Sequence, residues 1–432
     1  MAFEPRVLDP EPVADLEEYV GRGGGRGLDA ARRLGPVGVL DELEASGLRG
    51  RGGAGFPTGR KWRTVVENLS PTMPATVVVN AAEGEPGTFK DRAIVRANPY
   101  RVMEGALVAA ATVGADGVIV ALKASFHQEI ARIRAAMDEM RRAGWSEGVE
   151  MFVVEGPGEY LFGEETALLE VVAGREPFPR IAPPFRHGVD EAGPAVASAA
   201  GVAMAGPESE LTPPTLVNNA ETFANVANLL AEGPDWFRAV GTEQSTGTIV
   251  CTVTGRIRRH GVAEFPMGTS LGEVVDTVGG GTASGHEVMA VMSGVATPLV
   301  PGSALDTPVS YEGMEEIGSG LGTGGFIVFD DTTDPAAVAQ GVSHFLAVES
   351  CGQCTPCKQD GLALAELLER LRRSEPEAGL VASIQDRVST VSERARCYLA
   401  HQHQRVVDSI LRLFPDELEA HATGRRGAGR RE

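Results

Sequence analysis

Three of the five cysteines in this chain stand in one short segment, "ESCGQCTPCK". Cys351, Cys354 and Cys357 have the spacing C-x2-C-x2-C, and Cys397 follows 40 residues after Cys357. Three thiolates in such a loop can surround one face of a cube-like cluster, and a fourth thiolate completes the ligands of a [4Fe–4S] cluster. We predict this cluster, with Cys397 as the fourth ligand because it is the other cysteine in the region with a helical pattern.

Two other uses of these thiols stay open. Structural zinc also takes four thiolates, although it usually draws them as two separated pairs. Free thiols are the second alternative, whereas disulfides are disfavoured in a reducing compartment. Cys251 stands apart from the other four, and we expect it to be a small buried apolar side chain rather than a ligand.

A glycine-rich segment, "GRGGAGFPTGRKW", offers its backbone to a ligand. Gly50, Gly52 and Gly53 lack side chains where a flat or phosphorylated ligand would lie against the chain. Exposed N–H groups in such a loop form an anion-binding concavity, and Arg51 and Lys61 place positive charge nearby. The segment is neither a P-loop nor a G-x-G-x-x-G loop after a strand. A merely flexible loop is therefore the alternative interpretation.

Carboxylates and amides follow the apolar run "ATVVVN". Asn80, Glu83 and Glu85 come after this predicted strand, and ligands of open α/β sheets bind at the carboxyl ends of strands. Asn80 offers amide donors and an acceptor, and the two glutamates could accept hydrogen bonds from ribose hydroxyls. Two segments repeat the arrangement, "GEETALLE" with Glu164 and Glu165 and "TLVNNAETF" with Asn218 and Asn219. Helix capping or turn formation is the alternative explanation for each segment taken alone.

The elements that must hold these residues follow an alternating pattern from Ala75 onward. Three short apolar runs are typical of buried parallel strands, at residues 75–80, 117–122 and 149–156. Helical patterns follow them, at residues 99–112, 125–144 and 163–174. This alternation predicts an α/β fold with a parallel sheet covered by helices on both faces.

The remaining segments have different patterns. Residues 1–48 are a polar lead-in with short helices, of which "GVLDELEASGL" is amphipathic. Residues 175–215 are rich in Pro, Gly and Ala and predict an extended loop. Residues 245–330 predict two strands and then a helix, as in a small α+β module, and helices dominate from Asp334 onward. The basic tail "TGRRGAGRRE" is expected to be disordered.

The net charge of the chain and the lack of long apolar stretches disfavour several classes of function. The chain has 432 residues and a formal net charge of −20 at pH 7, which disfavours nucleic acid and anionic lipid as partners. The start, "MAFEPRVLDPEP", has no basic stretch followed by an apolar one, so we expect no signal peptide. No stretch approaches the roughly 18 uninterrupted apolar residues of a membrane-spanning helix. We therefore expect a cytosolic protein with reduced thiols.

Five segments in a fixed order resemble those of a known family. They are "GLRGRGGAGFPTG", "EGEPGTFKDR", "GEETAL", "VNNAETF" and "ESCGQCTPC". Over about residues 40–400 the chain resembles the flavin-bearing NADH-dehydrogenase subunit of respiratory complex I, a module also present in NAD-linked formate dehydrogenases and hydrogenases. The resemblance implies an N-terminal lead-in (1–48), a Rossmann-like FMN- and NADH-binding domain (49–244), a β-grasp module of the SLBB type (245–332), a helical bundle carrying the [4Fe–4S] cluster (333–420) and a disordered tail (421–432).

The resemblance also implies a chemistry, in which NADH gives a hydride to FMN and electrons pass singly through the cluster to partner subunits. The implied FMN contacts are Gly50, Gly52, Lys61, Asn80, Glu83, Tyr160, Gly163, Glu164, Val217, Asn218 and Asn219, to which we add Arg51 and Gly53 of the glycine-rich segment. The implied NADH contacts are Phe56, which would stack on a ring, Glu85, Glu165 and Phe185. The candidate catalytic residues are Glu83, Glu165 and Lys61.

Partner subunits are expected as well. The chain has no second set of cysteines, so the next redox centre must belong to another subunit. The resemblance implies a thioredoxin-like [2Fe–2S] subunit and a larger iron–sulfur subunit. We expect no nucleic-acid partner and no direct membrane insertion, with contact to a membrane only through partner subunits.

Several positions depart from the family pattern. Ala82 stands where the family has an aspartate, Ala182 where it often has a lysine, and Thr64 where it has an aromatic residue. Phe162 replaces a cysteine, and "YLAHQHQ" follows Cys397 in place of "xLGDAA". These departures motivate a second hypothesis, a paralogue that keeps FMN and the cluster but serves a donor other than NADH. A third hypothesis is a binding module whose β-grasp unit recognises a ligand and whose redox sites are vestigial.

Overall fold

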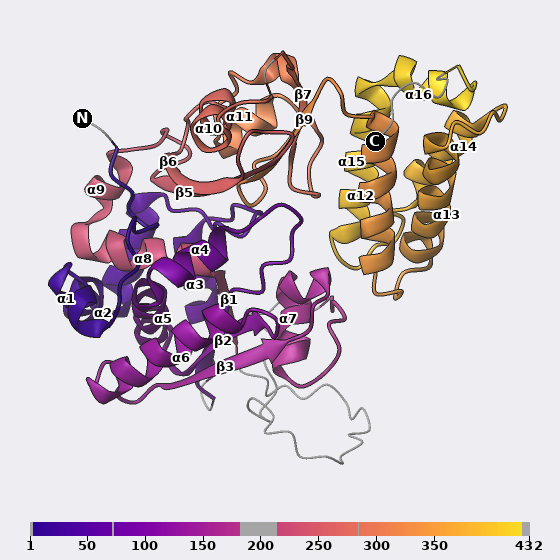
Figure 1. Cartoon of the computed structure of the whole chain (residues 1–432). Coiled ribbons are helices and arrows are strands. Elements are labelled where there is room, and N and C mark those ends of the chain that lie inside the picture. Colours follow the sequence, from indigo (N-terminus) through magenta and orange to yellow (C-terminus); the bar gives the residue numbers. More distant parts are fainter. Residues whose placement is uncertain (1–2, 71–72, 182–213, 284, 426–432) are drawn as a thin grey trace, which may run out of the picture. The chain divides into compact units, whose positions relative to one another are not determined.

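The computed structural model describes residues 3–70, 73–181, 214–283 and 285–425. The chain folds into two compact units, and most of their helices and strands are labelled in Figure 1. Unit 1 consists of Met1–Gly84, Phe89–Cys251 and Val262–Thr269, and unit 2 of Glu85–Thr88, Thr252–Gly261 and Ser270–Glu432. The finer domain boundaries expected from the sequence stay predictions.

Unit 1 is built on a four-stranded parallel sheet with the strand order β3-β2-β1-β4. Its strands are β1 (Ala75–Asn80), β2 (Ala115–Lys123), β3 (Glu150–Gly156) and β4 (Thr215–Asn219). In the register of the sheet, Val78 of β1 pairs with Ile119 of β2 and with Val217 of β4. β-branched apolar residues favour a pleated surface that is buried on both sides. The three predicted strands are confirmed, and β4 adds a fourth.

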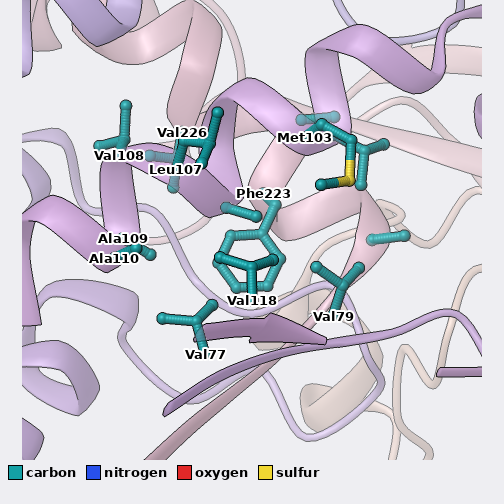
Figure 2. Close-up of a cluster of buried hydrophobic side chains, with 14 of the residues drawn as sticks. Val77, Val79, Met103, Leu107, Val108, Ala109, Ala110, Val118, Phe223 and Val226 are labelled. Atoms are coloured by element: carbon teal, nitrogen blue, oxygen red, sulfur yellow. The ribbon is translucent and has the colours of Figure 1, made fainter. Parts of the chain in front are cut away.

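Helices cover both faces of this sheet because successive side chains of a strand point to opposite sides. Val77 and Val79 of β1 share one core with α5 (Pro99–Val113), α6 (His127–Arg142) and α8 (Ala220–Glu232). Figure 2 shows the part of this core around Val77, Val79 and Phe223. Val78 belongs to a second core on the other face, with α7 (Glu165–Val172) and the 3-10 helix η1 (Tyr160–Gly163). The predicted parallel sheet with helices on both faces is confirmed.

The N-terminal segment contributes to the first core. α1 (Leu16–Gly21) is short, and α2 (Arg26–Ser46) is longer than the short helices predicted here. The predicted amphipathic segment is the second half of α2, because Gly35, at φ 67°, and Pro36 kink the helix between its halves. Val7 and Leu28 are buried with the sheet helices. Unit 1 also contains α3 (Thr58–Glu67), α4 (Lys90–Ala97) and α9 (Pro234–Arg238).

A second sheet, of mixed direction, has the strand order β6-β5-β9-β7-β8. Its strands are β5 (Thr248–Gly255), β6 (Gly261–Pro266), β7 (Val288–Ser293), β8 (Val300–Pro301) and β9 (Gly325–Asp330). β5 is parallel to β9, and β7 is antiparallel to it. The accompanying helices are α10 (Leu271–Gly279), η2 (Gly302–Ala304) and α11 (Tyr311–Glu316). The order β5, β6, α10 confirms the predicted small α+β module.

Helices make up the described chain after the second sheet. They are α12 (Pro335–Glu349), α13 (Thr355–Arg372), α14 (Leu380–Thr390), α15 (Leu399–Leu413) and α16 (Pro415–Ala422), and they are called the bundle below. Asp334 caps the first of them, since its carboxylate accepts a hydrogen bond from the backbone N–H of Ala336 at 2.9 Å. Apolar side chains at helical spacing, such as Leu364 and Leu368 of α13, are buried. The helices predicted from Asp334 onward are confirmed.

Some of the sequence predictions lie outside the described residues. Most of the extended loop predicted at 175–215 falls there, together with Ala182, Phe185 and the tail from residue 426. Within the described residues, no helix combines the length and the apolar character that crossing a membrane requires.

Candidate functional site

Two neighbouring strands of unit 1 end in asparagines. β1 ends at Asn80 and β4 at Asn218 and Asn219, and Asn80 pairs with Asn219 in the register of the sheet. Each side chain ties the edge to another segment of the chain. Asn80 donates from Nδ2 to the carbonyl of Gly163 at 2.8 Å, and Asn218 accepts at Oδ1 from the indole N–H of Trp62 at 2.8 Å. The carboxyl edge of the sheet is thereby fixed to η1 and α3.

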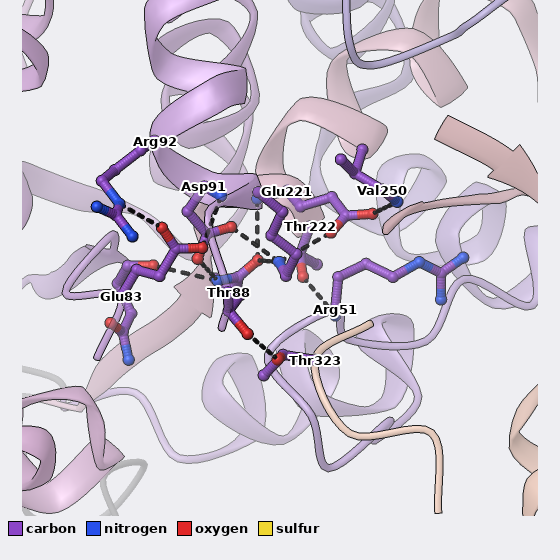
Figure 3. A network of polar contacts seen from close by, with 12 residues as sticks. Arg51, Glu83, Thr88, Asp91, Arg92, Glu221, Thr222, Val250 and Thr323 are labelled. Atoms are coloured by element: carbon purple, nitrogen blue, oxygen red, sulfur yellow. Dashed lines mark hydrogen bonds and ion pairs between the residues drawn. The ribbon is translucent and has the colours of Figure 1, made fainter. Parts of the chain in front are cut away.

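Asn219 is tied to α4 and is the N-cap of α8. Its Nδ2 donates to Oδ2 of Asp91 at 2.6 Å, and its Oδ1 accepts from the backbone N–H of Glu221 at 3.0 Å. Lys90, which is 1 % exposed, donates to the same Oδ1 at 3.1 Å. We call Lys90, Asp91, Asn219, Glu221 and Arg51 the buried charge network; Figure 3 shows the contacts around it.

The charges in this network determine the ionisation of its members. Burial lowers the pKa of Lys90, but the carboxylates of Asp91 and Glu221 outweigh burial and hold that pKa well above its usual range. Burial raises the pKa of Glu221, and the charges of Lys90 and Arg51 oppose this effect. Because each ammonium or carboxylate has an opposite charge at hand, the network can remain ionised in the interior.

The glycine-rich loop lies against the end of β4. A Cβ on Gly52 would stand 3.3 Å from Cβ of Asn219, and Gly53 has a φ of 111°, which glycine adopts without strain. Among the described residues, the backbone N–H groups of Gly52 and Gly53 donate to no acceptor, whereas that of Gly50 donates to the carbonyl of Phe56 at 2.9 Å. The loop therefore keeps two N–H donors for a ligand.

Arg51 does not supply the positive charge that the sequence predicted for a ligand. Its side chain is buried, and its guanidinium donates to the backbone carbonyls of Thr248, Arg49 and Thr246 at 2.9 to 3.0 Å. Its backbone N–H donates to Oγ1 of Thr222 at 2.9 Å. Because all these donors have protein acceptors, Arg51 anchors the glycine loop to the start of β5.

Lys61 and Glu165 do come together. The ammonium of Lys61 on α3 lies 2.5 Å from Oε1 of Glu165, the first residue of α7. The two side chains are 26 % and 36 % exposed, so both remain accessible to a ligand. Glu164 is the N-cap of α7 and accepts from the backbone N–H groups of Thr166 and Ala167 at 3.0 and 2.8 Å. Burial raises the pKa of Glu164, and these hydrogen bonds oppose that rise.

Glu83, the third candidate catalytic residue, has other partners. Its carboxylate accepts from Nε of Arg92 at 2.8 Å and from the backbone N–H of Asp91 at 3.0 Å, at the start of α4. The guanidinium of Arg92 also lies over the rings of Phe89 and Phe126, at 4.6 and 4.9 Å. Burial and the charge of Asp91 raise the pKa of Glu83, while Arg92 lowers it. In this structure Glu83 holds α4 against the end of β1.

Glu85 belongs to unit 2, where both of its carboxylate oxygens accept hydrogen bonds. Oε1 accepts from the backbone N–H of Val295 at 3.0 Å, and Oε2 from Oγ1 of Thr323 at 2.6 Å. Gly294 must be glycine here, because its φ is 66° and a Cβ would lie 2.2 Å from Oε1 of Glu85. The predicted role of Glu85 in binding nucleotide hydroxyls stays a prediction.

The remaining predicted contacts differ in accessibility. Phe56 is 49 % exposed beside the glycine loop, as a ring that stacks on a ligand must be. Tyr160 and Gly163 form the two ends of η1, next to the end of β1. Val217 is buried in the sheet and can offer a ligand only its backbone. Phe185 lies outside the described residues.

Two of the departures from the family pattern are buried together. Ala82 and Phe162 both belong to the core of Val78 and Val217, on the η1 face of the sheet. An aspartate at position 82 would place a charge among these apolar side chains, which costs several kcal/mol unless the charge is paired. Thr64 is half-buried and donates from Oγ1 to the carbonyl of Arg60 at 2.9 Å, and Ala182 lies outside the described residues.

Four cysteines gather in the bundle, and none of them forms a disulfide. Cys351, Cys354 and Cys357 occupy the connection from α12 to α13, and Cys354 is the N-cap of α13. The Sγ of Cys354 accepts a hydrogen bond from the backbone N–H of Arg396 at 3.4 Å, which places the segment of Cys397 beside it. The predicted fourth ligand, Cys397, thus lies in a segment that reaches the cysteine motif, between α14 and α15.

The surroundings of these sulfurs fit a [4Fe–4S] cluster. The Oγ of Ser350 lies 3.2 Å from the Sγ of Cys357, and the amide of Gln353 donates to the Sγ of Cys351 at 3.5 Å. Burial and the neighbouring sulfurs raise the pKa of Cys357, so this thiolate needs a compensating positive charge. A metal cluster supplies that charge, and hydrogen bonds to sulfur are a usual part of such sites.

Sequence reasoning missed the residues that brace the site. Lys90, Asp91 and Arg92 appear in the segment "TFKDR", but adjacent charged residues usually mark a solvated surface. Trp62, which is fully buried against Asn218, was likewise not singled out. The available signal was the run of three charged residues that begins at Lys90, shortly after the predicted strand that ends at Asn80. This run did not by itself indicate burial.

Three family models match the chain. The model described as the Nuo51 FMN-binding domain matches residues 43–228, the SLBB domain residues 250–293, and the NADH-ubiquinone oxidoreductase-F iron-sulfur binding region residues 337–421. The chain therefore carries an FMN-binding domain, an SLBB domain and a [4Fe–4S] binding region. These matches confirm the predicted fold class and the predicted cofactors.

Relatives and solved structures agree over nearly the whole chain. An F subunit of NADH-quinone oxidoreductase from Rhizobium meliloti, the one numbered 2, is 34 % identical over 98 % of this chain and 99 % of its own length. The F subunit of NADH-quinone oxidoreductase from Streptomyces coelicolor is 34 % identical over 96 % of this chain and 90 % of its own. A chain of NAD+-reducing [NiFe]-hydrogenase in its H2-reduced state is 30 % identical, with a TM-score of 0.81 over 97 % of this chain and 67 % of that chain. The protein therefore belongs to the family of NADH-quinone oxidoreductase F subunits.

Proposed function

We propose that FMN binds in unit 1 at the carboxyl ends of β1 and β4, and that Cys351, Cys354, Cys357 and Cys397 hold the [4Fe–4S] cluster. As a member of the family of F subunits, the chain is the electron-input subunit of a redox complex and an oxidoreductase that acts on NADH. The assignment of residues rests above all on the hydrogen bond from Arg396 to Cys354, because it brings the remote cysteine segment to the motif.

The residues of unit 1 bind and orient the flavin. When bound, FMN supplies the conversion between a two-electron hydride donor and one-electron acceptors. The free N–H groups of Gly52 and Gly53 and the ammonium of Lys61 are suited to a phosphate group, since they bring donors and positive charge to one edge. The asparagines and the buried charge network hold that edge in place.

The nucleotide is proposed to contact the exposed groups beside this edge. Phe56 offers a ring face for stacking, and Glu165 offers a carboxylate oxygen to hydroxyl groups. As nucleotide contacts, Glu85 and Phe185 stay predictions of the family resemblance. A nucleotide that takes up Glu165 must compete with Lys61, but a half-exposed ion pair contributes only about 0–1 kcal/mol.

Electrons are proposed to leave from the bundle to a partner subunit. Cys351, Cys354 and Cys397 are half-buried, so a cluster on them lies close to the protein surface. The fifth cysteine, Cys251, is buried in β5, and the chain holds no second set of thiol ligands. The proposed partners are a thioredoxin-like [2Fe–2S] subunit and a larger iron–sulfur subunit, which would provide any contact with a membrane.

A second candidate function follows from Ala82. Position 82 carries alanine, so the carboxylate that the family resemblance places at this position is not available to a ligand. A hydrogen bond to a charged group contributes about 1.5–3 kcal/mol, or roughly ten- to a hundred-fold in affinity. A paralogue that keeps FMN and the cluster but receives electrons from another donor is therefore the alternative.

Anaerobic titration of the purified chain with NADH, and in parallel with NADPH, tests these proposals. Flavin absorbance follows reduction of FMN, and low-temperature EPR follows the cluster. Bleaching of the flavin by NADH together with an iron–sulfur signal is expected, and Lys61→Met should weaken FMN binding roughly ten- to a hundred-fold relative to Arg63→Met on the same helix. Flavin that dithionite reduces but NADH does not would favour the paralogue. If the intact protein contains neither riboflavin phosphate nor acid-labile sulfide, both proposed functions are refuted.

A further inference from the structure

Lys90 is a fully buried ammonium with a complete set of acceptors. Its Nζ lies 2.8 Å from Oδ1 of Asp91, 2.8 Å from Oε2 of Glu221 and 3.1 Å from Oδ1 of Asn219. The contacts to Asp91 and Asn219 are hydrogen bonds, and the contact to Glu221 is an ion pair. Lys90 is therefore held by buried protein partners and is not exposed to a ligand.

The buried charge network is electrically balanced. Lys90 and Arg51 carry two positive charges, and Asp91 and Glu221 carry two negative charges, all within unit 1. Glu221 extends the network to β5, where its Oε1 accepts from the backbone N–H of Val250 at 2.9 Å. Apolar residues of similar volume often stabilise a protein as well as a buried ion network does. Stability alone is therefore a weak reason for four buried charges.

The network adjoins the edge where FMN is proposed to bind. Asn219 belongs to both, and all the hydrogen-bonding groups of its amide are occupied. Oδ1 accepts from Lys90 and from the backbone N–H of Glu221, and Nδ2 donates to Asp91 and, at 3.4 Å, to the carbonyl of Asn80. Gly52 lies directly over Asn219. Charges fixed in this way cannot reorient when a neighbouring group gains an electron.

We propose that Lys90 is a positioning residue that neutralises Asp91 and Glu221 beside the flavin and thereby sets its reduction potential. The inference rests on the proposed FMN site. Reduction adds negative charge to the flavin, and uncompensated carboxylates at a buried edge disfavour that charge. With Lys90 in place, the flavin meets a neutral network and is easier to reduce.

Redox titration of the flavin in the purified, FMN-loaded full-length protein tests this role. Lys90→Met removes the positive charge and should lower the flavin midpoint potential, whereas Glu221→Gln removes a negative charge and should raise it. The double variant K90M/E221Q restores the balance and should return the potential toward that of the wild type. Arg96→Gln, which removes a cation from the exposed side of the same helix and its pair with Glu129, should leave the potential unchanged.

The outcomes separate this inference from the proposed function. If purified wild-type protein contains no FMN, both the proposed function and this inference are overturned. If FMN is bound but K90M and E221Q have the midpoint potential of the wild type, the inference alone is overturned. A double variant that keeps the potential of K90M would show that loss of structure causes the shift, which also refutes the proposal. Should K90M fail to fold, a raised potential in E221Q supports the proposal and an unchanged one refutes it.

Discussion

At the scale of single residues, side chains that carry the same charge have different roles when they differ in burial. Lys61 pairs with Glu165 at a half-exposed position, whereas Lys90 pairs with Asp91 and Glu221 inside the protein. The exposed ammonium can exchange its partner for a ligand at little cost. The buried one cannot, because breaking a buried pair leaves an uncompensated charge that costs about 3–5 kcal/mol.

His403 on α15 shows the effect of burial without a counter-charge. Its Nε2 lies 2.7 Å from Oγ of Ser343 on α12, and its Nδ1 has no hydrogen-bond partner among the described residues. Gly361 of α13 leaves room for the ring, since a Cβ there would stand 3.4 Å from Nδ1. Burial lowers the pKa of His403 to about 4. The imidazole is therefore neutral near pH 7.

This pKa makes the stability of the bundle depend on pH. The unfolded chain binds a proton at His403 near pH 6.5 and the folded chain only near pH 4, so stability is lost as pH falls through that window. Between pH 7 and pH 5 the loss is about 2 kcal/mol. His403→Gln, which does not titrate, should remove this part of the pH dependence of unfolding in urea. Equal slopes in variant and wild type would contradict the prediction.

At the scale of elements, one glycine sets the distance between two helices of the first core. α5 and α8 pack against each other in the core that contains β1, and a Cβ on Gly105 of α5 would lie 1.9 Å from the backbone carbonyl oxygen of Phe223 on α8. Backbone cannot move aside as a flexible side chain can. The position of α8 matters for the site, because α8 begins at Asn219 and carries Glu221 and Thr222.

Gly105→Ala should therefore destabilise the protein by about 1–3 kcal/mol, the usual cost of overpacking. The matched control is Gly341→Ala in the middle of α12, where a Cβ would meet nothing within 4 Å. Because alanine favours a helix over glycine, this control should stabilise by roughly 0.5–1 kcal/mol. Denaturant unfolding followed by circular dichroism distinguishes the two, and effects of the same sign would contradict the packing argument.

At the scale of the whole molecule, the two proposed cofactor sites lie in different units. The glycine loop, the strand ends and the pair of Lys61 with Glu165 belong to unit 1, whereas the four clustered cysteines belong to the bundle of unit 2. Each unit has its own buried core. Loss of one cofactor should therefore leave the other in place.

Cys354→Ala should abolish the iron–sulfur signal and lower iron and sulfide content, while FMN stays bound and is still bleached by NADH. Cys251→Ala is the control, because Cys251 is buried in β5 and contributes to neither proposed site. It should keep both cofactors. Iron analysis, EPR and flavin absorbance on the same samples decide the question. Retention of a full cluster in C354A, or its loss in C251A, would refute the assignment of the ligands.

Local patterns predicted most of the fold. The strands at 75–80 and 149–156, the helices from Pro99 and from Asp334, and the α+β order after residue 245 followed from runs and periods that a short window contains. β4 and the first half of α2 were not predicted, because "TLVNN" is short and Gly35 with Pro36 interrupts the helical period. The spacing of Cys351, Cys354 and Cys357 indicated a cluster for the same local reason.

The sequence by itself determined the order of the elements, the cysteine motif and the set of polar residues at the strand ends, because spacing and periodicity are properties of neighbouring residues. Only the tertiary structure decided which of those polar residues face a ligand. Arg51 lies in the glycine-rich loop and Lys61 in α3, the helix that follows this loop. Arg51 is nevertheless buried, with its guanidinium bound to backbone carbonyls, whereas Lys61 is half exposed. Segments distant in sequence determine whether a charged side chain is buried, as the start of β5 does for Arg51. Burial in turn determines whether that side chain holds the fold together or is available to a ligand.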